Sequence, residues 1–183
     1  MDLKILLQIL GATLGILYLI LEYRANAWLW IVGMIMPIIH GILYFHSGLY
    51  ADFGMQVYYL VASLYGLTQW HKQAKNLPIT RTPRRLYIPL LLTVALLNVA
   101  LYFLLVAFTD STVPFFDALT TALSIVAMWM LARKYLEQWL VWLLTDLITV
   151  GLYTYKSLYI TAALYLLYSI LAIAGYRKWK LNC

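Results

Sequence analysis

The residues best suited to chemistry lie in the segment WLVWLLTDLITVGLYTY, where polar and aromatic side chains recur within an apolar run. Intervals of three, four, three and four residues separate Trp139, Trp142, Asp146, Thr149 and Tyr153. On a helix, residues three and four apart lie on one face. One face would therefore carry two indoles, a carboxylate, a hydroxyl and a phenol, while Leu, Ile and Val fill the other faces.

This combination predicts a binding site for a flat, positively charged ring. Aromatic faces attract and stack on such rings, and one aspartate balances one positive charge. A carboxylate in mid-membrane costs about 2.5–3.5 kcal/mol unless it faces an interior or a wet cavity. We expect Asp146 to be a ligand or proton site, and a structural hydrogen bond to a neighbouring helix is the alternative. The sequence shows no Gly-rich phosphate loop, paired metal ligands or nucleophile with a base, so we expect neither an enzyme nor a cofactor.

Other segments offer further polar or aromatic groups in apolar surroundings. The additional candidate substrate contacts are Trp30, His40, Gln56, Tyr59, Asn98 and Tyr168. The amide of Gln56 has two donors and an acceptor and needs a partner in lipid. A lone histidine such as His40 is more often a packing residue than a ligand. Four acidic residues near span ends are expected to reach water: Glu22, Asp52, Asp110 and Asp117.

The elements that must position these residues are transmembrane helices. The chain is 64% hydrophobic and 11% charged, with a mean hydropathy of +0.83, far more apolar than a soluble domain. We predict seven spans at 4–22, 28–46, 51–70, 86–108, 115–132, 139–155 and 158–176. A soluble helical core is the alternative, but the 86–108 segment lacks the polar face that a soluble helix needs. Several tryptophans near span ends suggest an aromatic belt: Trp28, Trp30, Trp70, Trp139 and Trp179.

Basic residues predict the orientation of these spans. If the loops alternate between two sides, eleven of the thirteen Lys and Arg residues fall on one side, and only Lys4 and Lys156 on the other. Cytoplasmic loops carry an excess of Lys and Arg. We therefore expect the N-terminus outside and the C-terminus in the cytoplasm. The net charge of +6 is then topological and does not indicate a nucleic-acid surface.

An internal repeat appears when the chain is shifted by 109 residues against itself. The shift aligns Trp30 with Trp139, Trp70 with Trp179 and Gly66 with Gly175, together with three Tyr pairs and an Arg pair. It maps the first three spans onto the last three and leaves 86–108 as a connector. One connecting span makes both units cross in the same direction, which is the parallel repeat found in some transporters. Duplication in a protein that does not transport is the alternative.

The chain resembles the PnuC-type vitamin transporters over nearly its whole length. The resemblance rests on NAWLWIVG, GLYADFGMQVYYLVASLYGLTQW, EQWLVWLLTD and ALYLLY. It implies an all-α membrane fold of three plus one plus three helices, SWEET-like, as a single domain over 1–183 with repeats at 4–70 and 115–179. It also implies uptake by facilitated diffusion at the bacterial cytoplasmic membrane, with a cytoplasmic vitamin kinase trapping the product. The family's contacts match Gln56, Tyr59, Trp139, Trp142 and Asp146.

The substrate is less sharply defined by the resemblance, whose known substrate classes are nicotinamide riboside, thiamine and riboflavin. The short chain and the acid at Asp146 favour the thiamine branch, and nicotinamide riboside is the alternative. Two other functions stay open. One is a proton-coupled transporter that uses Asp146 or His40, and the other is a non-transporting receptor or assembly subunit. Homo-oligomerisation also stays open.

Overall fold

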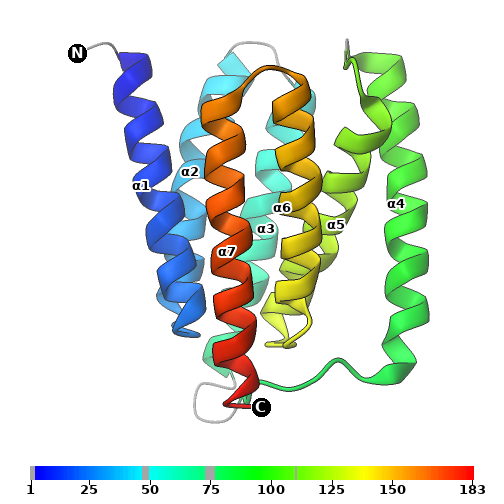
Figure 1. Ribbon diagram of the computed structural model, residues 1–183. Coiled ribbons are helices and arrows are strands. Elements are labelled where there is room, and N and C mark those ends of the chain that lie inside the picture. Colours follow the sequence, from blue (N-terminus) through cyan, green and yellow to red (C-terminus); the bar gives the residue numbers. More distant parts are fainter. Residues whose placement is uncertain (1–2, 47–49, 73–76, 110) are drawn as a thin grey trace. The chain divides into compact units, whose positions relative to one another are not determined.

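The computed structural model describes residues 3–46, 50–72, 77–109 and 111–183, and long α-helices make up most of them (Figure 1). The helices are α1 (Leu3–Tyr23), α2 (Trp28–His46), α3 (Tyr50–Lys72), α4 (Tyr87–Phe108), α5 (Pro114–Ala132), α6 (Gln138–Tyr155) and α7 (Tyr159–Lys180). A short 3-10 turn, Arg84–Leu86, leads into α4. Each predicted span corresponds to one helix whose ends lie within two residues of the prediction, except that α7 continues to Lys180.

The composition and exposure of the helices suit a bilayer. Among the described residues, three helices are long and apolar enough to cross a membrane: Arg84–Phe108, Pro114–Ala132 and Tyr159–Lys180. Asn98 is the one buried residue of α4, which is described in full, and Leu91, Leu96 and Phe103 are 65–71% exposed. In water this apolar surface would be costly, whereas lipid covers it without penalty.

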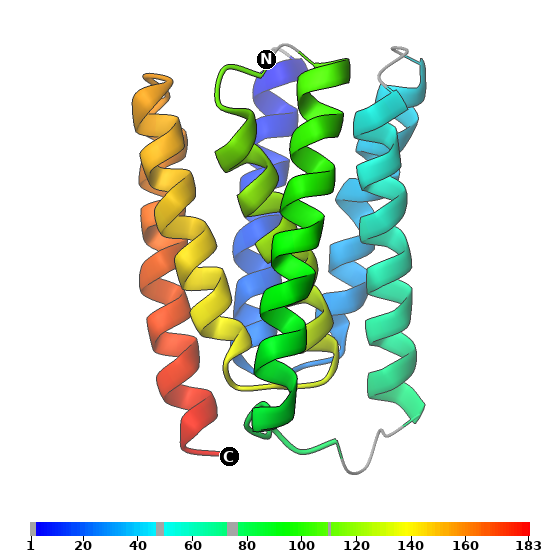
Figure 2. The same ribbon diagram turned by 90° about the vertical axis from the view of Figure 1, so that its right-hand side faces the viewer.

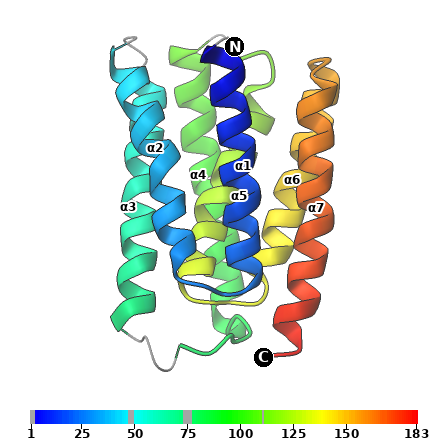
Figure 3. The ribbon, with the colours of Figure 1, turned by 90° about the vertical axis from the view of Figure 1, so that its left-hand side faces the viewer.

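The chain divides into two compact units, Met1–Leu77 and Pro78–Cys183, and the division falls in the longest predicted connection. In the first unit α1 packs on α2, and α2 packs on α3 (Figure 3). In the second unit α4 packs on α5, α5 on α6, and α6 on α7 (Figure 2).

A tryptophan fitted against a glycine joins two helices in each unit. In the second unit, a methyl group added to Gly175 of α7 would lie 2.6 Å from the Trp139 ring of α6. Trp179 meets the same ring edge-on, with centroids 5.6 Å apart and an interplanar angle of 90°. The equivalent positions of the first unit repeat this arrangement: Gly66 lies equally close under Trp30, and Trp70 stands edge-on to Trp30 at 5.6 Å and 89°. We call these two clusters the Trp–Gly locks.

The Trp–Gly locks correct the predicted aromatic belt. The four indoles of the locks are at most 4% exposed, so they do not lie at the lipid interface. Trp28, at 62% exposure, is the one tryptophan of the predicted belt whose side chain is open. A position near a span end did not predict that a tryptophan is exposed, because the ends of packed helices also have inward faces. Large rings fill the space that a glycine leaves on those faces.

The turns before α2 and α6 also have the same backbone geometry. Ala25 and Lys134, which are 109 residues apart, both adopt the left-handed conformation, with φ of 50° and 53°. The Ala25 N–H donates to the Glu22 carbonyl at 2.8 Å, and the Lys134 N–H donates to the Leu131 carbonyl at 2.9 Å. The next residue in each turn donates five residues back, from Asn26 to Leu21 and from Tyr135 to Met130. The two turns therefore match residue by residue at the repeat spacing.

In the second unit, the segment that precedes α4 is fastened to the α5–α6 turn. The Thr80 N–H donates to the Lys134 carbonyl at 3.1 Å, and the Leu136 N–H donates to the Thr80 carbonyl at 2.8 Å. The Glu137 carboxylate accepts two further bonds, from the Thr82 N–H at 2.6 Å and the Thr82 hydroxyl at 2.8 Å. Burial lowers the pKa of Lys134 in this turn. We call this group, Thr80, Thr82, Lys134, Leu136 and Glu137, the clasp.

Replacing Glu137 by alanine is expected to lower the melting temperature by about 3–12 °C. A hydrogen bond to a charged group contributes about 1.5–3 kcal/mol, and 1 kcal/mol corresponds to about 2–4 °C in a chain of this size. The loss would also leave the buried N–H of Thr82, which is 3% exposed, without its acceptor. Thermal unfolding of the detergent-purified protein measures the change. Glu137→Gln keeps an acceptor and should lose less; equal losses for both variants would show that the carboxylate's hydrogen bonds do not stabilise the clasp.

Candidate functional site

Most of the predicted polar and aromatic stripe of α6 lies on the buried side of that helix. Trp139, Asp146 and Thr149 are 1%, 6% and 8% exposed, and Trp142 is half-buried. The leucines on the other faces are open to the surroundings: Leu140, Leu144 and Leu147, at 44–50% exposure. The helical spacing therefore identified the buried side of α6, and exposed leucines cover its other side.

Several polar atoms on this face have no partner among the described residues. The indole Nε1 atoms of Trp139 and Trp142 are buried and donate to nothing there, and the Asp146 side chain beside them is 6% exposed. The neighbouring hydroxyls do not help, because Thr145 donates to the Val141 carbonyl and Thr149 to the Thr145 carbonyl of their own helix. A buried donor or acceptor that makes no hydrogen bond costs about 1–3 kcal/mol, and more when it is charged. The face therefore holds unmet hydrogen-bonding capacity that a polar ligand can satisfy.

Helix α7 adds tyrosines to the same part of the second unit. The Asp146 carboxylate acts electrostatically on the Tyr168 phenol, which places this predicted site residue near the charge. Tyr165 lies edge-on to Tyr168, with centroids 5.6 Å apart. It also stacks on Tyr153 of α6 at 5.5 Å, with the planes only 20° apart. The sequence analysis placed Tyr153 on the α6 stripe but did not predict its stacking on Tyr165. Spacing along one helix does not show which ring of the next helix a side chain will contact.

Four of the predicted contacts belong to the first unit. Trp30 is fully buried in a Trp–Gly lock. His40, Gln56 and Tyr59 are half-buried. Gln56 of α3 lies against α2, with its Cβ 3.5 Å from the position that a Cβ on Gly41 would take, and Tyr59 stands edge-on to Tyr58. Because α2 packs on α3, His40 of α2 lies on a helix next to the one that carries Gln56 and Tyr59.

Asn98 is buried on a helix that is otherwise exposed. Its side chain is 9% exposed, and its Oδ1 atom has no hydrogen-bond partner in the part of the chain that the structure describes. Since α4 packs on α5, this amide lies at the interface of those two helices. Within the described residues, no three His, Cys, Asp or Glu side chains gather where they could hold a metal ion.

One of the acidic residues near the span ends is less exposed to water than predicted. Glu22 is 1% exposed and does not reach water as expected, because the side chain at the end of α1 turns into the packed interior. The Asp117 side chain is 29% exposed, as expected. Asp110 and the side chain of Asp52 lie outside the described residues.

Comparison with known proteins places the whole chain in one family. A family model described as "Nicotinamide mononucleotide transporter" matches residues 5–181. The chain belongs to this family. Its fold is therefore that of a multi-pass membrane protein, as the apolar helices and the sequence resemblance indicated.

Curated relatives in the family carry different vitamins. The chain is 25% identical to "Nicotinamide riboside transporter PnuC" of Escherichia coli K12 over 201 residues, covering 94% of this chain and 84% of the relative. It is 29% identical to "Riboflavin/roseoflavin transporter RibM" of Streptomyces davaonensis over 182 residues, covering 96% and 84%. These relatives are transporters, in agreement with the prediction that the chain is not an enzyme.

A solved structure of the family has the same fold. The chain superimposes on the structure described as "Crystal structure of the Vitamin B3 transporter PnuC" with a TM-score of 0.72, at 20% identity, covering 93% of this chain and 79% of that one. This likeness supports the all-helical family fold and leaves the choice of substrate to the site residues.

Proposed function

We propose that this protein imports a flat, cationic heteroaromatic vitamin across the bacterial cytoplasmic membrane by facilitated diffusion. The observation that carries the proposal is the α6 face, where the buried Asp146 lies one turn from the Trp142 indole, whose Nε1 has no partner among the described residues. A cationic ring would neutralise the carboxylate and stack on the aromatic side chains. Trp139 is fitted into a Trp–Gly lock, so in this proposal it shapes the site from behind and Trp142 is the more direct contact.

Thiamine is the substrate that we propose, with nicotinamide riboside as the second candidate. Both are flat cations, and an acid at Asp146 suits thiamine's thiazolium and its aminopyrimidine. Nicotinamide riboside is favoured by the name of the Escherichia coli relative. The proposed contacts are Trp142, Asp146 and Tyr168 in the second unit and His40, Gln56 and Tyr59 in the first, with Trp30, Asn98 and Trp139 in supporting positions.

We also propose that the chain consists of two parallel three-helix repeats, α1–α3 and α5–α7, joined by α4, with all seven helices crossing the membrane. The Trp–Gly locks and the matching left-handed turns support this arrangement, since both recur at a spacing of 109 residues. Transporters with parallel repeats hold their substrate near mid-membrane between the repeats. The loop charges would place the N-terminus outside and the C-terminus in the cytoplasm, where a vitamin kinase traps the product.

A binding titration of the purified protein should separate the candidate substrates. We expect saturable quenching of tryptophan fluorescence by thiamine, weaker quenching by nicotinamide riboside and the weakest by riboflavin, which lacks the positive charge. A Trp142→Phe variant should keep most of the binding while losing part of the signal. Tighter binding of riboflavin than of either cation would contradict the charge argument.

Uptake into liposomes should distinguish facilitated diffusion from its alternatives. We expect the internal thiamine concentration to reach, but not exceed, the external one, with or without a pH gradient. Accumulation above equilibrium driven by protons would show a coupled transporter that uses Asp146 or His40. Binding without any flux would indicate a receptor or an assembly subunit.

A further inference from the structure

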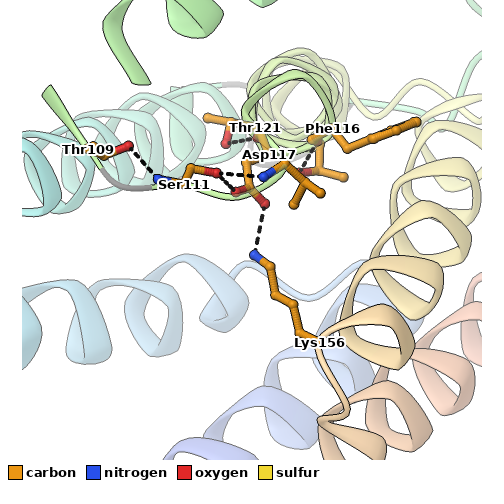
Figure 4. Close-up of polar contacts among 8 residues, drawn as sticks. Thr109, Ser111, Phe116, Asp117, Thr121 and Lys156 are labelled. Carbon is orange, nitrogen blue, oxygen red and sulfur yellow. Dashed lines mark hydrogen bonds and ion pairs between the residues drawn. The ribbon is translucent and has the colours of Figure 1, made fainter. Parts of the chain in front are cut away.

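At one end of the second unit, an ion pair between described residues connects the start of α5 with the α6–α7 turn. Lys156, the residue that follows α6, reaches Asp117 in the first turn of α5, with its Nζ 3.5 Å from Oδ1 (Figure 4). The Ser111 hydroxyl donates to the other carboxylate oxygen, Oδ2, at 2.5 Å, and accepts a bond from the Val113 N–H at 3.3 Å. We call Ser111, Asp117 and Lys156 the latch.

The clasp lies at the opposite end of the same unit, and its construction is different. Figures 1 and 2 show the α5–α6 turn and the segment before α4 at one end, and the α4–α5 connection and α6–α7 turn at the other. The clasp consists of backbone and carboxylate hydrogen bonds of 2.6–3.1 Å, with Thr82 only 3% exposed. The latch joins side chains that are 33% and 29% exposed, where water and salt compete for the charges.

The helices between these two ends form two pairs. The Trp–Gly lock joins α6 to α7 near the clasp, and the Tyr153–Tyr165 stack joins them again closer to the latch. Helix α4 packs on α5 as the other pair. Several hydroxyls between the ends bond within their own helices and do not tie α5 to α6: Thr120, Thr121, Ser124, Thr145 and Thr149. Helix α5 also packs on α6, so the two pairs are in contact between their ends. The clasp fastens the pairs with short, buried hydrogen bonds, and the latch holds them with a partly exposed ion pair, which is the weaker tie.

We propose that the second unit opens at the latch and pivots at the clasp, so that the α6–α7 pair swings as one body away from the α4–α5 pair. The inference rests on the proposed function, because in the proposed topology the latch end faces outside, the side from which the vitamin enters. Release of the Lys156–Asp117 pair then exposes the α6 face that carries Asp146 to external solvent. Rigid-body movement about a few hinge residues is a common mode of gating.

Chemical labelling tests this opening without any substrate. In a background with the chain's one cysteine, Cys183, replaced by serine, a Thr149→Cys reporter on α6 is labelled by a membrane-impermeant thiol reagent added outside. Adding Lys156→Met should speed labelling about two- to fivefold, the range expected from losing one exposed ion pair. High salt should accelerate labelling of the parent protein and leave the Lys156→Met variant unchanged. Equal labelling rates in both proteins would overturn the proposal.

Cross-linking tests the pivot, with the two ends as matched controls. Cysteines at positions 117 and 156, joined by a short bifunctional thiol reagent, should block liposome uptake, and cleavage of the linker should restore it. Cysteines at positions 82 and 137, joined in the same way at the clasp, should leave uptake intact. The charge-swapped variant Asp117→Lys with Lys156→Asp should return labelling to the parental rate if the ion pair itself acts. Undiminished uptake with the latch cross-linked would contradict the inference, whereas absence of uptake in every protein, with labelling as expected, would refute the proposed transport instead.

Discussion

Gly175→Ala is expected to lower the melting temperature of the protein by up to about 8 °C, after the gain in helix propensity is subtracted from the cost of overpacking. The added methyl group would lie 2.6 Å from the Trp139 ring, a distance that side chains do not tolerate. Overpacking of this kind costs about 1–3 kcal/mol, and 1 kcal/mol corresponds to about 2–4 °C here. Alanine's better helix propensity, about 0.8–1.0 kcal/mol, offsets only part of this cost. Gly66→Ala should act in the same way in the first unit, where Trp30 lies just as close.

Two other glycines provide matched controls. Among the described residues, apart from chain neighbours and the helix's own backbone, no atom lies within 4 Å of the position that a Cβ would take on Gly151 of α6 or on Gly54 of α3. Gly151→Ala and Gly54→Ala should therefore hold or raise the melting temperature, because only the helix propensity changes. A fall of similar size in all four variants would mean that glycine is needed for helix flexibility, and the packing explanation of the Trp–Gly locks would be wrong.

Asp146→Asn is expected to weaken binding of thiamine by at least about 30-fold while raising the melting temperature. Truncating one partner of a buried charge pair costs about 2–5 kcal/mol of binding free energy. Without ligand, however, the Asp146 side chain is only 6% exposed, so its charge destabilises the empty protein. Asparagine removes that charge at nearly the same volume. Fluorescence titration and thermal unfolding of one purified sample measure both effects.

Weaker binding together with a higher melting temperature would exclude misfolding as the cause of the lost binding. A variant that loses binding because it is misfolded would also melt earlier. Loss of binding together with a lower melting temperature would therefore point to a structural hydrogen bond from Asp146, the alternative raised by the sequence. Unchanged affinity would remove Asp146 from the binding site altogether.

Much of the fold was predictable because lipid imposes a simple rule on sequence. Apolar runs of about 20 residues become helices in a bilayer, where every backbone group must bond internally. The helix bounds consequently matched the predicted spans, and only α7 ran further, through the charged residues Arg177 to Lys180. The clasp was not predictable, since its bonds join residues about 55 positions apart, and two of the four join backbone atoms that carry no sequence signal.

Helical spacing predicted which side of α6 is buried, but not which residues of the neighbouring helices that side meets. Helical spacing put Asp146 and Trp142 on one buried face of α6, as the structure shows. It did not show that Trp139 fills the gap above a glycine of α7, or that Tyr153 stacks on Tyr165. Such contacts depend on how two helices are rotated against each other, which the period of a single helix does not contain.

The close fit of tryptophan on glycine also limits how the sequence can diverge. A larger residue at position 66 or 175 is acceptable only after the facing indole, Trp30 or Trp139, has been replaced by a smaller side chain. A smaller side chain alone would leave a void. Substitutions at these positions should therefore occur in pairs, so that the history of the gene would show them as coupled changes. Because each unit carries its own pair, the two halves are free to drift apart from each other while each stays consistent within itself.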